Sequence, residues 1–516
     1  LMKKRRWYLT SLMLCAVLLA GCGQKKAAEE TKKNDKKIEE TTQLEVETKT
    51  KTDTAEDEVK AVAEKFKDRK SEDLGFFKVY YPDSWKFDAD SERKEESYAQ
   101  VTFFEGESKD SASHQVYLSA TNEDAYTYRK ELNANGIDLK ACAEGKLDTV
   151  KIGNVDCIEY QIVNTDKYIY RYRHEPSGIS YTFRVNKGYG DKEIDELFEG
   201  IWLELKDEGN KDAPWPWEGE PFQPELKEQM VGAYTIVPEY IPFEESQGIF
   251  EIMEHKFYKQ GDQLFHLLED KLDTYEYSVD VLKYVSTLEL EGECEYISAD
   301  SSGMLYLSRG IPEIFGVKDG KKALQTTVKG DLSMHSSGEW GITFWVNSDT
   351  QKVTNQGGVL TAEPWILTGL NDDATRKGPF SMLDNVQVTD QHILVAGKTA
   401  GEDSNTKIMV YDYDGNQLLE LGGTEISDRD VLGYITGMAE TENGFVATDG
   451  NMRRIQFWNK EGVHVGDIET KDIFGTGYPW LEDMQLLEDG SILIMVTQER
   501  EDKSANELML FRLTGF

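Results

Sequence analysis

The sequence is short of proline, of positive charge and of long hydrophobic runs. Among 516 residues there are 12 prolines, and 58 Lys and Arg residues stand against 96 Asp and Glu, a formal net charge of −38. The proline count, beside 43 glycines, excludes collagen-like and proline-rich classes. The acidity repels phosphate backbones, so nucleic acid is not an expected partner. At 39% hydrophobic residues the chain is globular, and its length predicts two or three domains.

Familiar catalytic and metal motifs are also missing. The sequence contains no C-x-x-C, no H-E-x-x-H, no G-x-S-x-G and no phosphate-binding glycine loop. Its 7 histidines are scattered, with no Cys/His cluster at zinc spacing. We therefore predict no catalytic residue, no metal site and no cofactor.

The N-terminal segment has the features of an export signal. Lys3, Lys4, Arg5 and Arg6 precede a largely apolar stretch over residues 7–20, shorter than the ~20 residues that a spanning helix needs. No later segment approaches that length, so no second membrane pass is expected. The stretch ends in Leu19, Ala20, Gly21 and Cys22.

These four residues resemble the bacterial lipobox. The resemblance implies a signal peptide over residues 1–21, recognised by its peptidase through Leu19, Ala20 and Gly21, and a lipid-modified Cys22 as the mature N-terminus. Acyl chains on Cys22 would hold the protein on the outer face of the cell membrane, an extracytoplasmic location. The alternatives are an ordinary cleaved signal with a chance cysteine, or an uncleaved anchor.

The composition of residues 22–72 predicts a flexible tether. Lys, Glu, Thr, Asp and Ala dominate this segment, and it has too few apolar residues to offset the entropy of ordering. We expect a disordered charged stalk that lifts the globular part off the membrane, with a binding tail as the alternative.

Residues 73–206 predict an α+β domain with an antiparallel sheet. Alternating β-branched and aromatic residues indicate six strands, and two helices are expected over residues 124–134 and 191–202. Tyr168, Tyr170 and Tyr172 should lie on one sheet face, and Arg171 and Arg173 on the other. The opening residues Tyr81 to Trp85, the strand order and the closing amphipathic helix resemble the PsbP/Mog1-like fold, whose members are mostly non-enzymatic binding or assembly modules.

Cysteine accounting leaves one question open. Of the 5 cysteines, Cys15 lies in the signal and Cys22 is the lipidation residue, which leaves Cys142, Cys157 and Cys294. Export permits a bridge between Cys142 and Cys157. Three buried thiols are the other interpretation.

A linker over residues 207–224 contains four of the 12 prolines and two tryptophans, which predicts a stiff connector. Beyond it, residues 225–516 repeat a polar turn followed by a short strand. The turns centre on Gly261, Gly303, Gly338, Gln391, Gly444 and Gly490, and their mean spacing of about 46 residues is the length of a propeller blade.

We therefore expect a multidomain, mainly β protein in which the α+β domain precedes an all-β propeller of six four-stranded blades. The repeats resemble the NHL/TolB-like group, because the Gly-His and Trp-Asp signature of WD40 repeats does not recur. The chain ends after a third strand, so we predict that a strand near residues 231–237 completes the last blade.

Segments that enter the inner strands supply the candidate ligand-binding residues. They are Phe380, Asp384, Tyr434, Tyr478, Trp480 and Asp483. Aromatic faces edged by carboxylates suit sugars, peptides or cationic ligands. The alternative is that the aromatic side chains cap the packing between blades.

Two functions follow from these observations. The first is a membrane-anchored binding or scaffold module for a protein, peptide or glycan of the cell envelope. The alternative is an extracellular hydrolase or lyase acting on glycan or wall polymer, with paired carboxylates in the propeller funnel.

Overall fold

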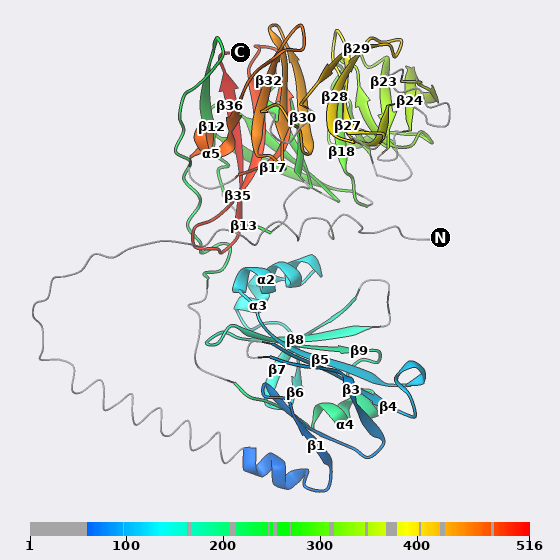
Figure 1. Cartoon of the computed structure of the whole chain (residues 1–516), viewed down its shortest axis with the longest axis vertical. Helices are drawn as coiled ribbons and strands as arrows, with labels where there is room; N and C mark the ends of the chain where they lie inside the picture. Colours follow the sequence, from blue (N-terminus) through cyan, green and yellow to red (C-terminus); the bar gives the residue numbers. More distant parts are fainter. Residues whose placement is uncertain are drawn as a thin grey trace, which may run out of the picture.

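The structure is a computed structural model that describes residues 59–95, 98–162, 165, 167–205, 213–245, 248–250, 255–268, 270–290, 292–308, 314–345, 349–367, 379–401, 404–423, 429–475 and 479–516. The predicted signal peptide with Leu19, Ala20 and Gly21, the predicted lipidation residue Cys22, and Tyr478 lie outside the described residues. Figure 1 shows an N-terminal group of strands in blue to teal and a C-terminal group in green to red. Within the described ranges, no helix is both long enough and apolar enough for a membrane crossing.

A seven-stranded antiparallel sheet forms the centre of the N-terminal part. Its strands, in spatial order, are β3 (Trp85–Lys94), β4 (Tyr98–Glu105), β5 (Gln115–Asn122), β9 (Ile179–Val185), β8 (Tyr168–His174), β7 (Val155–Gln161) and β6 (Thr149–Ile152). A smaller sheet pairs β1 (Lys70–Asp73), β2 (Phe77–Tyr81) and β10 (Ile201–Leu203). Residues 59–65 are helical, and the helices that follow are η1 (Lys109–Ser111), α2 (Ala125–Ala134), α3 (Leu139–Ala143) and α4 (Lys192–Phe198). All six strands predicted in this part are present, with shifted ends.

The second predicted helix is shorter than expected. It ends at Phe198, and residues 201–203 form β10 instead. The backbone N–H of Tyr80 donates to the Gly200 carbonyl at 2.8 Å, and a Cβ on Gly200 would lie 1.9 Å from the Tyr80 oxygen. This close approach to β2, which helical periodicity cannot reveal, converts the helix end into a strand.

The alternation along β8 separates the two faces of the sheet as predicted. Tyr170 packs with Phe198 of α4, with ring centroids 5.2 Å apart. On the other face, the Arg171 guanidinium pairs with Glu123 at 2.5 Å and with Glu131 at 2.7 Å. Helix α4 therefore covers one face of the sheet and α2 the other, as Figure 1 shows.

The C-terminal part is a series of small antiparallel sheets. Five have four strands in sequence order. Their strands are β14 (His255–Gln260), β15 (Gln263–Leu268), β16 (Lys271–Tyr277), β17 (Leu282–Glu289); β18 (Tyr296–Ala299), β19 (Leu305–Ser308), β20 (Ile314–Lys318), β21 (Lys321–Gln325); β22 (Asp331–Met334), β23 (Trp340–Phe344), β24 (Thr350–Gln356), β25 (Val359–Pro364); β26 (Phe380–Val388), β27 (Ile393–Thr399), β28 (Thr406–Tyr411), β29 (Gln417–Leu421); and β30 (Ile435–Thr441), β31 (Gly444–Asp449), β32 (Arg454–Asn459), β33 (His464–Glu469). The short helix α5 (Thr470–Phe474) follows.

A sixth sheet joins the two ends of this part. It orders β11 (Gln229–Val231), β12 (Tyr234–Ile241), β36 (Asn506–Thr514), β35 (Ile492–Glu499) and β34 (Trp480–Leu486), and β13 (Gly248–Ile249) pairs with β36. The predicted closing strand is confirmed, although it lies at Tyr234–Ile241 and not at residues 231–237, because Gly232 turns the chain between β11 and β12.

The sheets form a closed ring. The first strands contact one another in the order β14, β18, β22, β26, β30 and β34, and β34 contacts β14. The six predicted turn positions all fall at the first hairpin of a sheet. At Gly261 and Gly490 the φ angles of 57° and 81° lie in the left-handed region that favours glycine. Sheets repeated around a central channel are the arrangement of a β-propeller.

The linker packs between the two parts. The Arg129 guanidinium of α2 donates to the carbonyls of Ala213 at 2.8 Å and Pro214 at 2.6 Å, and it lies over the Trp215 ring. Trp215 stacks on Trp217, with centroids 5.4 Å apart. The tryptophans thus pack on each other and on the N-terminal part.

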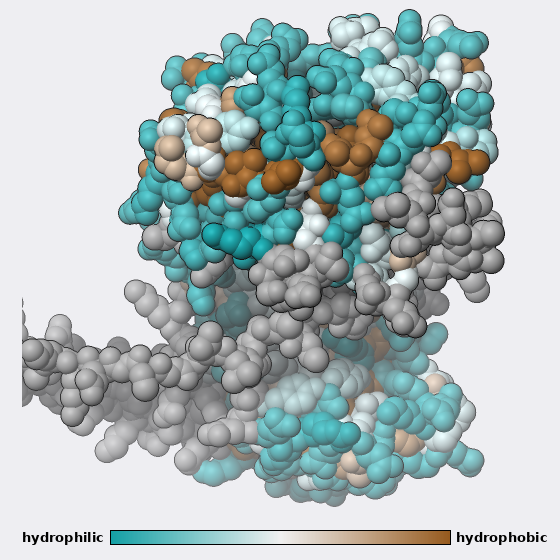
Figure 2. All heavy atoms as spheres, turned by 45° about the horizontal axis from the view of Figure 1, so that its top comes forward, coloured by the Kyte–Doolittle hydropathy of each residue, from teal (hydrophilic) through white to brown (hydrophobic). Residues whose placement is uncertain are grey.

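The surface is mainly polar. Figure 2 shows hydrophilic residues over most of the described surface and a band of hydrophobic residues across the C-terminal part. Large exposed hydrophobic side chains include Tyr284 in β17, Val359 in β25 and Leu418 in β29. Each of these three side chains lies on the last strand of a different sheet.

Candidate functional site

The first strands of the sheets surround the channel and run in one direction. Asp483 in β34 accepts from the backbone N–H of Phe257 at 3.1 Å, and Gln485 accepts from the N–H of Lys259 at 2.7 Å. From the first hydrogen bond to the second, the residue number rises by two in both strands, so β14 and β34 run parallel. We call the end of the ring at which these first strands begin the channel mouth.

Three neighbouring first strands carry a β-bulge near the channel mouth. The irregularities lie between Leu383 and Asn385 in β26, between Ile435 and Gly437 in β30, and between Leu481 and Asp483 in β34. The extra residues are Asp384, Thr436 and Glu482. A bulge leaves one residue out of the ladder, so its carbonyl needs another partner.

Lys256 of β14 supplies that partner for two of the bulges. Its Nζ donates to the carbonyl oxygens of Thr436 at 3.3 Å and Glu482 at 3.2 Å, and it lies 3.7 Å from Asp483 Oδ1. The side chain of Lys256 therefore reaches past β34 to β30. One ammonium group holds together backbone from three sheets.

Both predicted carboxylates lie at the channel mouth and bind the neighbouring sheet. Desolvation raises the pKa of Asp483, while the charge of Lys256 opposes the increase. Desolvation also raises the pKa of Asp384 to about 7, while a hydrogen bond from the Ile435 backbone N–H acts to lower this pKa. Asp384 and Asp483 thus connect adjacent sheets.

Two further carboxylates at the channel mouth were not predicted from the sequence. Asp331 begins β22, and Glu295 immediately precedes β18. Desolvation raises the pKa of Asp331 to about 7, with a further increase from Glu295 and an opposing effect of Lys256. Desolvation also raises the pKa of Glu295.

The Asp331 carboxylate at the start of β22 is not fully hydrogen-bonded. Its Oδ1 atom is buried and has no hydrogen-bond partner among the described residues. An unmet buried acceptor costs about 1 to 3 kcal/mol, so a ligand donor at this atom would be favourable. The only sequence signal for Asp331 was the presence of a polar residue at the first position of an inner strand.

The predicted aromatic residues are mostly packed inside the ring. Phe380 is 3% exposed and Trp480 is 7% exposed. Phe380 belongs to the core around β26, and the Trp480 ring lies against Gly450. Tyr434 is half-buried, and its backbone N–H donates to Asp449 at 3.1 Å. The packing alternative describes the positions of Phe380 and Trp480, while Tyr478 lies outside the described residues.

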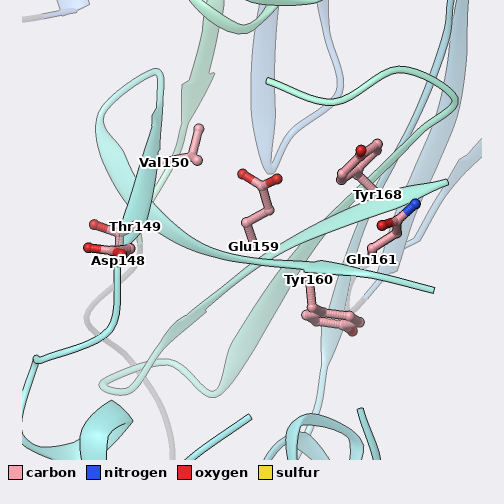
Figure 3. A pocket seen from close by; sticks show the side chains of 7 residues that line it. All are labelled: Asp148, Thr149, Val150, Glu159, Tyr160, Gln161 and Tyr168. Carbon is pink, nitrogen blue, oxygen red and sulfur yellow. The ribbon is translucent and has the colours of Figure 1, made fainter. Parts of the chain in front are cut away.

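A separate hollow of about 330 Å³ lies at the edge of the N-terminal sheet. Figure 3 shows the carboxylate of Glu159 projecting from β7 between Val150 and Tyr168, while Tyr160 points to the opposite side of the strand. Desolvation raises the pKa of Glu159. Asp148 and Gln161 also line the hollow, so its chemistry suits a hydrogen-bond donor.

None of the three remaining cysteines forms a disulfide bond within the described residues. Cys142 is half-buried, and Cys157 and Cys294 are buried. Burial raises the pKa of both Cys142 and Cys157, which disfavours the reactive thiolate.

No protein-family model and no curated protein matches this chain. Among solved structures, the chain is similar to the WD40 β-propeller domain of Doa1, at 11% identity and a TM-score of 0.35, over 58% of this chain and 97% of that chain. It is also similar to the β-propeller domain of Myceliophteria thermophila Cps50 (Swd1), at 9% identity and a TM-score of 0.34, over 53% of this chain and 99% of that chain.

Proposed function

We propose that the protein is a membrane-anchored extracytoplasmic lipoprotein that binds a protein, peptide or glycan of the cell envelope at the channel mouth. In this proposal the propeller has six blades and is NHL/TolB-like, and the N-terminal part is a PsbP/Mog1-like α+β domain. The observation that carries the binding function is Asp331, whose buried Oδ1 lacks a partner among the described residues at the end of the ring where Lys256, Asp384 and Asp483 also lie.

The position of the N-terminal part supports this assignment. The end of β35 pairs with the start of β34 and the start of β36, so the β35–β36 hairpin lies at the channel mouth. At this hairpin, Asn506 Nδ2 donates to the Tyr126 hydroxyl of α2 at 2.9 Å, and Tyr126 packs against Phe250. Helix α2 therefore lies beside the channel mouth, where both parts can contact one ligand.

A ligand screen with matched variants tests the binding function. The full chain is mixed with soluble peptidoglycan fragments and with peptides, and the shift in melting temperature is measured. A ligand that stabilises the wild type and an Asp412→Asn control, but not Asp331→Asn, supports a site at the channel mouth. Asp412 is partly exposed beside a turn and serves as the control. A ligand that stabilises all three proteins equally contradicts the site.

The same carboxylates support a second candidate function, a glycan- or wall-polymer-acting hydrolase. A general acid needs a pKa near the working pH, and the pKa of Asp331 is raised to about 7 beside Glu295. Release of soluble sugars from wall polymer by the wild type, lost in Asp331→Asn and Glu295→Gln, is expected for this function. Binding without release by the wild type contradicts it.

The anchor is tested independently of the ligand. Replacing Cys22 by Ser should abolish incorporation of a labelled fatty acid and move the protein from the membrane fraction to the soluble fraction. Replacing Cys15 by Ser, within the apolar stretch of the signal, should leave both unchanged. Retention of the label in Cys22→Ser would contradict the lipidation site.

A further inference from the structure

Three side chains from separate segments converge in the N-terminal part. His114 directly precedes β5, Asp191 is the N-cap of α4, and Glu193 lies in its first turn. One potential ligand atom from each lies within 4.8 Å of the others. We propose that His114, Asp191 and Glu193 form a binding site for a divalent transition-metal ion of the Zn²⁺ type.

The spacing between His114 and Asp191 suits a shared ion better than a direct hydrogen bond. His114 Nε2 lies 3.3 Å from Asp191 Oδ1 and 3.4 Å from Oδ2. A charge-assisted N–H···O bond is normally ~2.7 to 2.9 Å long. Two ligands that each lie ~2.1 Å from a tetrahedral Zn²⁺ ion are about 3.4 Å apart.

The other ring nitrogen of His114 is already held. Nδ1 lies 2.6 Å from Glu105 Oε2 at the end of β4. Histidine ligands of metals commonly donate this second N–H to a carboxylate, which fixes the tautomer and turns the free lone pair toward the ion. Glu105 thus presents Nε2 of His114 to Asp191 and Glu193, in the arrangement of a carboxylate–histidine–metal triad.

The Asp191 carboxylate can serve the ion without losing its structural role. Its Oδ1 accepts the backbone N–H groups of Glu193 at 3.2 Å and Ile194 at 3.4 Å, which caps α4. Its Oδ2 remains available to the ion. Imidazole with carboxylates is a donor set that Zn²⁺ accepts, whereas Mg²⁺ and Ca²⁺ favour oxygen ligands alone.

Other histidine–carboxylate pairs in the described residues lack this third ligand. His392 lies 2.8 Å from Glu440, and His335 lies 3.6 Å from Asp390. No further group of three such ligands occurs within the described ranges. His392 is therefore a matched control. Its distance to Glu440 is similar to that between His114 and Glu105, but His392 belongs to no group of three potential ligands within the described ranges.

Titration calorimetry with ZnCl₂ on the full-length, chelator-treated chain tests the site. We expect one Zn²⁺ ion per chain, no binding to His114→Ala, and unchanged binding to His392→Ala. Glu105→Gln should weaken binding by ~10- to 100-fold, the usual loss when such a supporting carboxylate is removed. Zn²⁺ should also raise the melting temperature of the wild type, because the ion binds only the folded chain.

The proposal is overturned if the wild type binds no Zn²⁺, or if Glu193→Gln and His114→Ala bind it as the wild type does. Glu193 is only partly buried, so we expect Glu193→Gln to fold. This variant therefore still tests the site if His114→Ala does not fold. Circular dichroism verifies the fold of each variant. Tighter binding of Ca²⁺ than of Zn²⁺ would overturn the assignment of the metal class. None of these outcomes depends on ligand binding at the channel mouth.

Discussion

At the scale of single residues, the channel mouth concentrates groups whose ionisation is set by burial. Asp331 and Asp384 both have a pKa raised to about 7, and desolvation is the largest cause for each. Lys256 is the cation nearest to Asp483 and also acts on Asp331. The charge state of this region therefore changes close to neutral pH.

Removing Lys256 should destabilise the ring. Lys256→Met removes the hydrogen bonds to the Thr436 carbonyl, which keeps a bond from Asn385, and to the Glu482 carbonyl, and we expect a loss of about 1 to 3 kcal/mol in the free energy of unfolding. Lys259→Met on the same strand, whose ammonium lies over the Tyr277 ring, should cost less than ~1 kcal/mol. Urea denaturation measures both variants, and equal losses would contradict the role of Lys256.

The Asp331 carboxyl should make stability depend on pH. Its folded pKa of about 7 exceeds the ordinary value of 3.8, so the folded state binds the extra proton. The stabilisation is complete below about pH 4 and is lost as the pH rises through 7. Asp331→Asn should then be more stable than the wild type at about pH 8, by a few kcal/mol, since each pKa unit corresponds to ~1.4 kcal/mol.

Thermal melts of both proteins at about pH 5 and pH 8 check this prediction. The advantage of Asp331→Asn should shrink or reverse at the lower pH. A difference between variant and wild type that is the same at both values would show that the carboxyl does not titrate as expected.

At the scale of elements, strand β12 decides whether the ring is closed. It pairs with β36 from Val237 to Ile241, and so joins the start of the C-terminal part to its end. Without it, β36 would present an unpaired edge, which favours aggregation. Closure by a strand from the other end of the domain makes the sixth sheet dependent on long-range pairing.

Truncating the buried face of β12 should test this dependence. Ile236 is fully buried and Val237 is 38% exposed. Ile236→Ala should lower the free energy of unfolding by about 2 to 5 kcal/mol, and Val237→Ala by less than ~1 kcal/mol. Deletion of residues 225–240 should cause aggregation or loss of cooperative unfolding, and an unchanged melt would contradict the closure role.

At the scale of the whole molecule, a few polar contacts place the two parts beside each other. Arg129 binds the linker carbonyls, and Arg500, which pairs with Glu507 at 2.7 Å, donates to the Pro216 carbonyl at 2.5 Å. The linker is thereby held by both parts. Their relative position matters because α2 lies next to the channel mouth.

Arg129→Ala should loosen this arrangement. Each lost hydrogen bond from a charged donor is worth ~1.5 to 3 kcal/mol, so we expect a larger radius of gyration in small-angle X-ray scattering. Arg184→Ala is the control, because Arg184 is exposed on β9 over the Tyr117 ring. An unchanged radius in Arg129→Ala would show that other contacts hold the two parts.

The sequence by itself determined the features that depend on neighbouring residues. The six strands predicted in the N-terminal part, the turns at Gly261 to Gly490 and the need for a closing strand follow from local alternation, glycine turns and repeat spacing. The resemblance of residues 19–22 to a lipobox also rests on a linear pattern, and lipidation at Cys22 stays a prediction.

Only the tertiary structure decided which side chains meet. Lys256 reaches carbonyls as far as 226 residues away, and His114 lies 77 residues from Asp191. Phe380 and Trp480, two of the aromatic residues expected at the channel mouth, are buried in the packed ring. Burial, and not residue type, raises the pKa of Asp331 and Asp384, and burial is a property of the assembled ring that no local pattern encodes.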